Sequence, residues 1–214
     1  KNINYLDNDH RIIVMKSDLN KNNYDKIIFA EENLIFAKIP KSIKYISSFS
    51  FLQCNNLVEI QIQEDSELRT IDKCAFSDTK ITKLFIPEKV DELKEGWCKQ
   101  TKYLNEIIIS PKNKNYKYLD KENQIIVRKS DPTISNFDTI VFANRNIQHC
   151  IIPKTIKYIE SYAFENCEKL EFIQIPPNSE LQSIGKKSFS NTSIQTISIP
   201  SNVNEIKYGW NKKS

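Results

Sequence analysis

The chain has 214 residues, of which 39% are hydrophobic and 27% charged, a balance typical of a folded protein rather than a disordered one. Its 31 basic and 27 acidic residues are interspersed, so the net charge of +4 comes without the basic stripe expected of a nucleic-acid-binding protein. No segment approaches the ~18 consecutive apolar residues of a transmembrane helix, so we expect no membrane span in this chain.

The sequence aligns with itself, without a gap, when it is shifted so that Tyr5 falls on Tyr118. The segment YLDNDHRIIVMKSD from Tyr5 then meets YLDKENQIIVRKSD from Tyr118, and residues 1–101 match 114–214 at 48 of 101 positions. Such a duplication predicts a repeat architecture. We therefore interpret residues 1–214 as a single solenoid of two super-repeats, 1–113 and 114–214, the second truncated. The chain starts at Lys1 in mid-unit with no leader sequence, which favours a fragment of a longer array.

Each copy contains a short unit with a predicted turn at its centre. The turn is Asp7-Asn8-Asp9-His10 in the first copy and residues 120–123 (DKEN) in the second, each between two extended segments. We expect a hairpin-like variant coil here, once in each copy of the duplication.

Strand-like blocks of the type L-x-x-I-x-I follow in chain order through both copies. Because their last two apolar residues alternate at period two, they indicate one face of a short strand that stacks on its neighbours. Prolines such as Pro40 and Pro153 follow several blocks and are expected to end the pairing. The spacing is nearly constant apart from one shorter step, and the blocks end at Val14, Ile39, Ile62, Ile86, Ile109, Val127, Ile152, Ile175 and Ile199. We expect these strands to form one parallel sheet.

Other apolar residues recur between the strands and predict the opposite wall of each coil. Cys54 and Cys167 share one repeat position and are expected to be reduced and buried. Trp97 and Trp210 follow glycine in the same register, which favours a packing role over a ligand-facing one. Four phenylalanines are expected to fill the core, namely Phe51, Phe76, Phe164 and Phe189.

The motif I-P-x-x-I-x-x-I-x-x-x-x-F-x-x-C-x-x-L-x-x-I-x-I, at 39–62 and 152–175, resembles the treponemal-type leucine-rich repeat of BspA-like proteins. The insert NKNYKYLD, followed by IIV, resembles the variant coil of the same family, so the resemblance covers essentially the whole chain. It implies a β-rich leucine-rich-repeat solenoid of the α/β repeat class, with one parallel sheet on a concave face. It also implies a cell-surface or secreted location and adhesion to host or neighbouring-cell proteins.

The sequence carries little that points to catalysis or to a cofactor. His10 and His149 are the only histidines and do not occupy equivalent repeat positions. With three glycines in total, a phosphate-binding G-x-G-x-x-G or P-loop is not expected. No catalytic motif stands out, so we expect no enzyme, no catalytic residue, no metal and no cofactor. Asn191-Thr192-Ser193 is the only glycosylation sequon, and it matters only if the chain is secreted.

The remaining candidate site is the outward face of the strands, where residues between the anchors point away from the core. The preceding coil of each copy is expected to present equivalent outward positions. These are Phe36 and Lys38 in the first copy, and His149 and Ile151 in the second. Large apolar groups on a polar face mark interaction sites when they cluster, although they can also pack under loops or against coils outside this chain. The candidate ligand-binding residues are Glu59, Gln61, Lys83, Phe85, Glu106, Ile108, Phe172, Gln174, Thr196 and Ser198.

Three functional hypotheses belong to different classes. The first is a non-enzymatic protein-binding module of a cell-surface protein, which recognises a protein ligand through the concave sheet. The second is an intracellular scaffold that uses the same face for protein–protein interaction. The third, a hydrolase, has no nucleophile–base pair to support it. A leader or a C-terminal span in the full reading frame would separate the first two.

Overall fold

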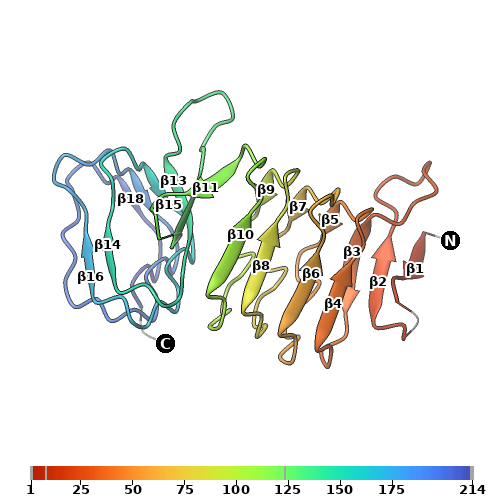
Figure 1. Cartoon of the computed structure of the whole chain (residues 1–214). Coiled ribbons are helices and arrows are strands. Elements are labelled where there is room, and N and C mark those ends of the chain that lie inside the picture. Colours follow the sequence, from red (N-terminus) through yellow and green to blue (C-terminus); the bar gives the residue numbers. More distant parts are fainter. Residues whose placement is uncertain (1, 8, 123, 213–214) are drawn as a thin grey trace. The chain divides into compact units, whose positions relative to one another are not determined.

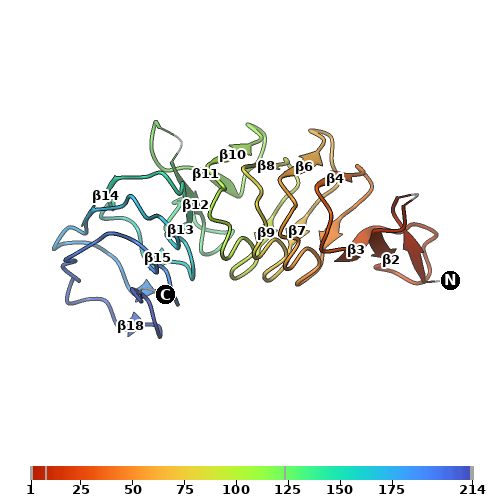
Figure 2. The same ribbon diagram turned by 90° about the horizontal axis from the view of Figure 1, so that it is seen from below.

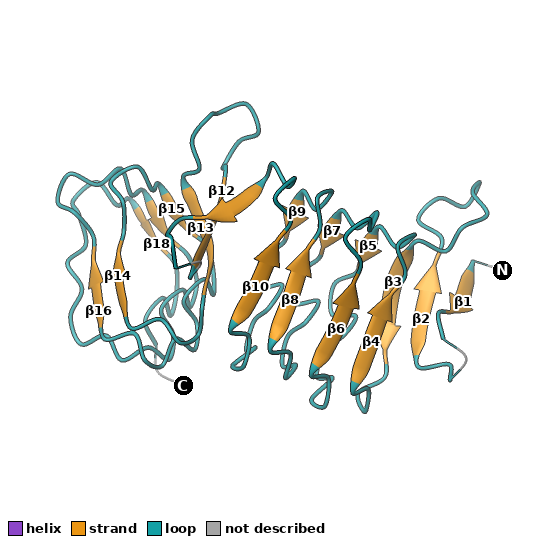
Figure 3. Cartoon of the chain, viewed as in Figure 1, coloured by secondary structure: helices purple, strands orange, loops and turns teal. Residues whose placement is uncertain are grey.

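The structure, a computed structural model, describes residues 2–7, 9–122 and 124–212 (Figure 1). Its described residues form 18 β-strands and no helix (Figure 3). The chain divides into two compact units, residues 1–114 and 115–214. This boundary adjoins the end of the first super-repeat, so each unit corresponds to one copy of the duplication.

Ten strands belong to the first unit, and they form two kinds of sheet. The strands are β1 (Ile3–Tyr5), β2 (Ile12–Met15), β3 (Lys26–Ala30), β4 (Phe36–Ile39), β5 (Tyr45–Ile46), β6 (Glu59–Ile62), β7 (Thr70–Ile71), β8 (Lys83–Ile86), β9 (Glu92–Leu93) and β10 (Glu106–Ile109). Strands β4 and β6 pair in parallel, as do β8 and β10, whereas the other six strands form a sheet of order β1-β2-β3-β5-β7-β9. Figure 2 shows the two kinds of sheet as opposite layers of the unit.

The second unit repeats this arrangement with eight strands. They are β11 (Tyr116–Tyr118), β12 (Ile125–Arg128), β13 (Thr139–Ala143), β14 (His149–Ile151), β15 (Tyr158–Ile159), β16 (Phe172–Gln174), β17 (Ser183–Ile184) and β18 (Glu205–Ile206). Strands β14 and β16 pair in parallel, and the other six form a sheet of order β11-β12-β13-β15-β17-β18. Apart from β8 and β10, every strand of the first unit has a counterpart at the equivalent position of the second.

The predicted hairpin coil is present in both units. Strand β1 pairs antiparallel with β2, and β11 pairs antiparallel with β12. The turn aspartate closes each hairpin: Asp7 Oδ1 accepts hydrogen bonds from the backbone N–H groups of Arg11 and Ile12 at 2.9 and 3.1 Å. Asp120 accepts equivalent bonds at 2.8 and 2.7 Å. Asn8 and Asn123 of the two turns lie outside the described residues.

The structure corrects the prediction that all nine strands share one parallel sheet. The segments ending near Val14 and Val127 lie in the six-stranded sheets, where β2 and β12 run antiparallel to both neighbours. The reason is the hairpin, which reverses the chain before each of these strands. The segment ending at Ile199 is not assigned as a strand, although Ile194, Ile197 and Ile199 pack against the buried core.

A second closure recurs in the loops that follow β2 and β12. Asp25 accepts hydrogen bonds from the backbone N–H and the hydroxyl of Ser17 at 2.9 and 2.8 Å. Asp138 accepts the same pair from Ser130 at 2.8 and 2.7 Å. Both aspartates are almost fully buried. Each loop is therefore tied at its base by one carboxylate.

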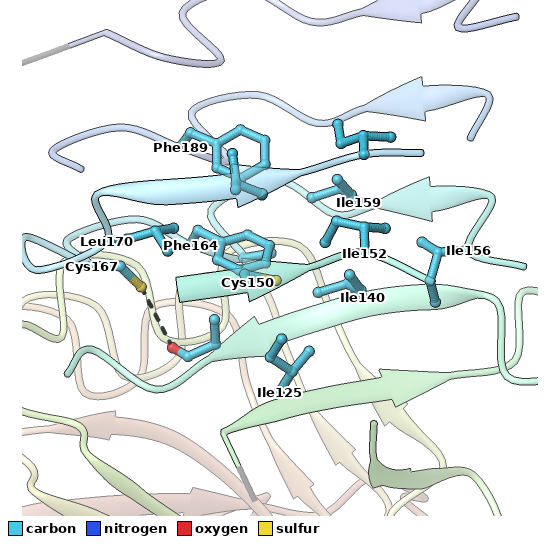
Figure 4. Close-up of a cluster of buried hydrophobic side chains, with 14 of the residues drawn as sticks. Ile125, Ile140, Cys150, Ile152, Ile156, Ile159, Phe164, Cys167, Leu170 and Phe189 are labelled. Atoms are coloured by element: carbon cyan, nitrogen blue, oxygen red, sulfur yellow. Dashed lines mark hydrogen bonds between the residues drawn. The ribbon is translucent and has the colours of Figure 1, made fainter. Parts of the chain in front are cut away.

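The predicted phenylalanine core is confirmed. All four phenylalanines are buried, and those of neighbouring coils are in contact, with ring centroids 5.4 Å apart for Phe51–Phe76 and 5.0 Å for Phe164–Phe189. In the second unit Phe164 and Phe189 lie among the isoleucines of several coils (Figure 4). Removal of these apolar surfaces from water is the main force holding the coils together.

The cysteines and tryptophans take the packing roles expected of them. None of the five cysteines forms a disulfide bond, and all five are buried. The Cys54 thiol lies 3.5 Å from the carbonyl oxygen of Glu31, and the Cys167 thiol lies 3.5 Å from that of Asn144. Trp97 is buried, and the half-buried Trp210 packs edge-on against Phe189 with centroids 6.2 Å apart.

The predicted fold class, a repeat solenoid with stacked parallel strands, is confirmed. The coils return through turns rather than helices in the described part of the chain. Several turns place residues other than glycine at positive φ, and these recur from coil to coil, as at Gln53, Asp78 and Gln100. The described residues also include no helix long and apolar enough to cross a membrane.

Candidate ligand-binding face

The strands that lie outside the six-stranded sheets present their outward side chains on a separate face in each unit. In the first unit, the strands alternate between buried core residues and exposed or half-buried outward residues, as predicted. Glu59, Gln61, Lys83 and Glu106 are exposed. We call the outward residues of β4, β6, β8 and β10 the first long-strand face.

The first long-strand face carries both apolar and charged side chains. Register places Phe36 beside Glu59 on one pair of strands, and Phe85 beside Ile108 on the other. Phe36 is 43% exposed, whereas Phe85 and Ile108 are half-buried. The structure thus brings Phe85 and Ile108 together as an apolar pair. The salt bridge from Lys83 Nζ to Glu106 Oε1, 3.0 Å long, lies beside this pair, nearer the start of the same two strands.

The second long-strand face comprises the outward residues of β14 and β16 together with Thr196 and Ser198. Register places His149 beside Phe172, with ring centroids 6.4 Å apart, and Ile151 beside Gln174. Phe172 is 50% exposed and Ile151 is 65% exposed. These two side chains therefore do not pack beneath loops of the described chain.

The sequence interpretation missed two apolar residues at the edge of the first face. Ile35 and Val58 are 62% and 43% exposed, and the backbone N–H of Val58 donates to the carbonyl oxygen of Ile35 at 3.0 Å. Each directly precedes its strand and therefore falls outside the alternating pattern. The only feature of the sequence that could have identified them is a β-branched apolar residue directly before each strand. Together with Phe36 they extend the apolar part of the face.

A groove lies at the same place on each face. In the first unit it measures about 440 Å³ and lies between β6 and β8, which belong to separate two-stranded sheets. In the second unit it measures about 610 Å³ and lies between β16 and residues 195–198. Residues at equivalent positions of the duplication line the two grooves. In the first unit these are Val58, Glu59, Gln61, Thr82, Lys83 and Phe85, and in the second they are, in the same order, Glu171, Phe172, Gln174, Gln195, Thr196 and Ser198.

Three of the buried cysteines have thiols that are poorly suited to nucleophilic catalysis. Burial raises the pKa of the Cys150 thiol to about 12 and the pKa values of Cys54 and Cys167 to about 11. These thiols stay protonated at neutral pH, and a thiol is a much weaker nucleophile than a thiolate. His149 is exposed, and its ring lies beside that of Phe172. No group of three or more potential metal ligands occurs among the described residues.

The family of the chain follows from its repeats. The model of the BspA type leucine rich repeat region matches six copies, over residues 22–123 and 119–214. The chain belongs to the BspA-type leucine-rich-repeat family. Repeats of this type generally form protein-interaction modules. The BspA-type pattern seen in the sequence is thereby confirmed, and the two matches correspond to the two copies of the duplication.

Three solved structures share the fold of this BspA-type chain. The first is the pneumococcal vaccine antigen PcpA, with a TM-score of 0.68 and 21% sequence identity. The second is a leucine rich cell surface protein from Faecalibacterium prausnitzii, with a TM-score of 0.64 and 19% identity. The third is a leucine-rich repeat protein from Eubacterium ventriosum, with a TM-score of 0.59 and 18% identity. The matches cover 80%, 84% and 81% of this chain but only 40%, 51% and 50% of those proteins. No curated protein matches the chain in sequence.

Proposed function

We propose that this chain is a non-enzymatic, protein-binding module of a cell-surface protein, and that it acts in adhesion to host or neighbouring-cell proteins. Membership of the BspA-type family supports protein binding, and a similar fold in a protein named as a cell surface protein supports the location. The observation that carries the proposal is the set of large apolar side chains on the two long-strand faces, especially Phe172 and Ile151.

Exposed apolar groups of this size are the usual centres of protein interfaces. Binding energy concentrates in a few large side chains that lose water on association, while polar neighbours form the rim. Phe85, Ile108 and Phe172 are the proposed anchors. Their proposed polar rim is Glu59, Gln61, Lys83, Glu106, Gln174, Thr196 and Ser198, all of them exposed.

The test is the triple variant Phe85→Ser, Ile108→Ser, Phe172→Ser. Beads coated with the parent chain or the variant are applied to intact host cells and to immobilised matrix proteins. We expect attachment of the variant to weaken at least tenfold, or ~1.4 kcal/mol. Circular dichroism must show that the variant is folded, since Phe85 and Ile108 are half-buried.

A matched control removes three exposed apolar groups that lie elsewhere: Leu19→Ser, Phe29→Ser and Tyr208→Ser. It is expected to attach like the parent. A folded triple variant that attaches as well as the parent would defeat the proposal.

The proposed location is tested separately, by antibody labelling of cells that make the native protein. Intact cells are expected to be labelled, and labelling only after permeabilisation would favour an intracellular scaffold.

A further inference from the structure

The two equivalent grooves differ in charge, although the duplication placed them at the same position. Glu171 is the only charged side chain that lines the groove of the second unit. It is exposed, and none of the ion pairs among the described residues includes it. In the first unit a lysine, Lys83, stands where the second unit has Thr196. The second groove is therefore lined by one negative charge and no positive charge, whereas the first is lined by both Glu59 and Lys83.

The other lining residues of the second groove complement a peptide. Phe172 follows Glu171 in sequence, lines the same groove and is half-exposed, so the groove presents both an aromatic ring and a carboxylate to a ligand. Gln174 and Gln195 carry amide groups, which both donate and accept hydrogen bonds. Thr196 and Ser198 add hydroxyl groups on the side opposite β16. Buried Ile173 and Ile175 lie between these side chains.

A groove that presents both a carboxylate and an aromatic ring suits a basic side chain. The guanidinium group of arginine forms charge-assisted hydrogen bonds with a carboxylate and is attracted to the face of a ring. The amides and hydroxyls can bind the backbone on either side of that residue. We propose that the groove of the second unit binds an arginine or lysine side chain carried by an extended segment of the protein partner. This inference rests on the proposed function and names the chemistry of the partner.

The same reasoning explains why the first groove does not serve as a second copy of this site. Lys83 lines that groove and is held by Glu106 at 3.0 Å, so it places a positive charge where a basic ligand would approach. Like charges in contact are repulsive and oppose binding. The charged side chains that line the first groove, Glu59 and Lys83, therefore cancel, whereas the lining of the second groove keeps the single negative charge of Glu171.

The probes are three synthetic peptides of equal length and neutral composition that differ only in a central arginine, glutamine or glutamate. Each is titrated into the full chain, uniformly labelled with nitrogen-15, and the amide shifts are followed. Because the chain carries a net charge of +4, its overall field does not attract a basic peptide. We expect the arginine peptide to shift the amides of Ile173, Gln195 and Ser198, to bind at least fivefold more tightly than the glutamine peptide, and to weaken as salt is added.

Two variants and one control assign the binding to the groove. Glu171→Gln removes the carboxylate and is expected to abolish the preference for arginine over glutamine. Thr196→Lys gives the second groove the lysine of the first, and is expected to weaken the arginine peptide at least tenfold. Both side chains are exposed, so neither change should disturb the fold. Glu180→Gln, an exposed carboxylate outside the groove, is expected to change nothing.

Three results would overturn the inference: equal binding of all three peptides, shifts confined to other residues, or unaltered arginine preference in both groove variants. The inference would also be overturned if none of the three peptides bound. A preference for the glutamine peptide would also overturn it and would indicate a neutral partner segment. If the apolar triple variant loses attachment while the arginine preference is absent, the groove inference fails and the proposed function stands. If the preference is present and the triple variant attaches normally, the proposed function fails.

Discussion

At the scale of the residue, burial decides which members of the repeat pattern hold the fold. Phe164 and Phe172 belong to the same coil, yet Phe164 is fully buried and Phe172 is half-exposed. Phe164 stacks on Phe189 of the next coil, whereas Phe172 neighbours the exposed His149. One phenylalanine therefore contributes to stability and the other is available for binding.

Phe164→Ala is expected to lower the free energy of unfolding by ~3–5 kcal/mol, because it deletes a fully buried ring and leaves a cavity between coils. Urea denaturation followed by far-UV circular dichroism measures this loss. Phe172→Ala is the matched control and is expected to change stability by less than ~1 kcal/mol, since its ring is half in water already. Equal losses for the two variants would contradict the assignment of Phe164 to the core.

At the scale of the element, each unit keeps its coils in place with buried polar closures that the repeat pattern does not display. The loop after β2 is closed by Asp25, which binds Ser17 twice and lies 3.5 Å from Lys44 Nζ. Burial by itself raises the pKa of Asp25, but the hydrogen bonds from Ser17 and the Lys44 ammonium group together lower it by more, so that it lies below its ordinary value of 3.8.

Asp25→Asn is expected to reduce stability at neutral pH by ~1–3 kcal/mol, because the charged acceptor of Ser17 is lost. Since the folded-state pKa is depressed, the contribution of Asp25 is fully present above about pH 4 and is lost as the pH falls through the folded value. The difference between parent and variant should therefore shrink in acid. Urea midpoints from about pH 7 down to pH 2 test this.

The control for this prediction is Asp18→Asn, a more exposed aspartate of the same loop. It is expected to leave both the midpoint at neutral pH and its pH dependence close to those of the parent. A difference between parent and Asp25→Asn that stays constant down to pH 2 would show that the lost stability does not depend on the charge of Asp25.

At the scale of the whole molecule, the duplication predicts a single solenoid over residues 1–214, and we retain this as a prediction. Each unit has its own core, and one tryptophan reports on each: Trp97 on the first and Trp210 on the second. In a continuous solenoid, stability is shared through interfaces between neighbouring coils, so distant coils unfold together.

The variants Trp97→Phe and Trp210→Phe each leave one tryptophan. In each variant, we expect the fluorescence transition of the remaining tryptophan to coincide with the loss of far-UV circular dichroism of the whole chain. Coincident midpoints would indicate one cooperative solenoid. Two separated transitions, with each tryptophan following a different part of the circular dichroism signal, would show that residues 1–114 and 115–214 unfold as independent bodies.

The repeat, its core and its hairpin turns could all be predicted from the amino-acid sequence. The long period of the duplication, the buried Phe51 and Phe164, and the hairpin turns at Asp7 and Asp120 all follow from local features: apolar spacing, recurrence and turn-forming residues. The alternation inside each long strand also gave the correct outward side chains, because successive side chains of a strand point to opposite faces whatever the strand pairs with.

Which backbones pair, and which surfaces stay open, depends on how the coils pack in three dimensions. An apolar pattern states which side of a strand is buried, but ladder hydrogen bonds depend on the direction and distance of the neighbouring backbone. For that reason the sequence did not predict that β2 pairs antiparallel with β3 and β12 with β13, nor that residues 194–199 pack without forming a strand. The two grooves have the same origin, since each lies where neighbouring segments share a core but no ladder.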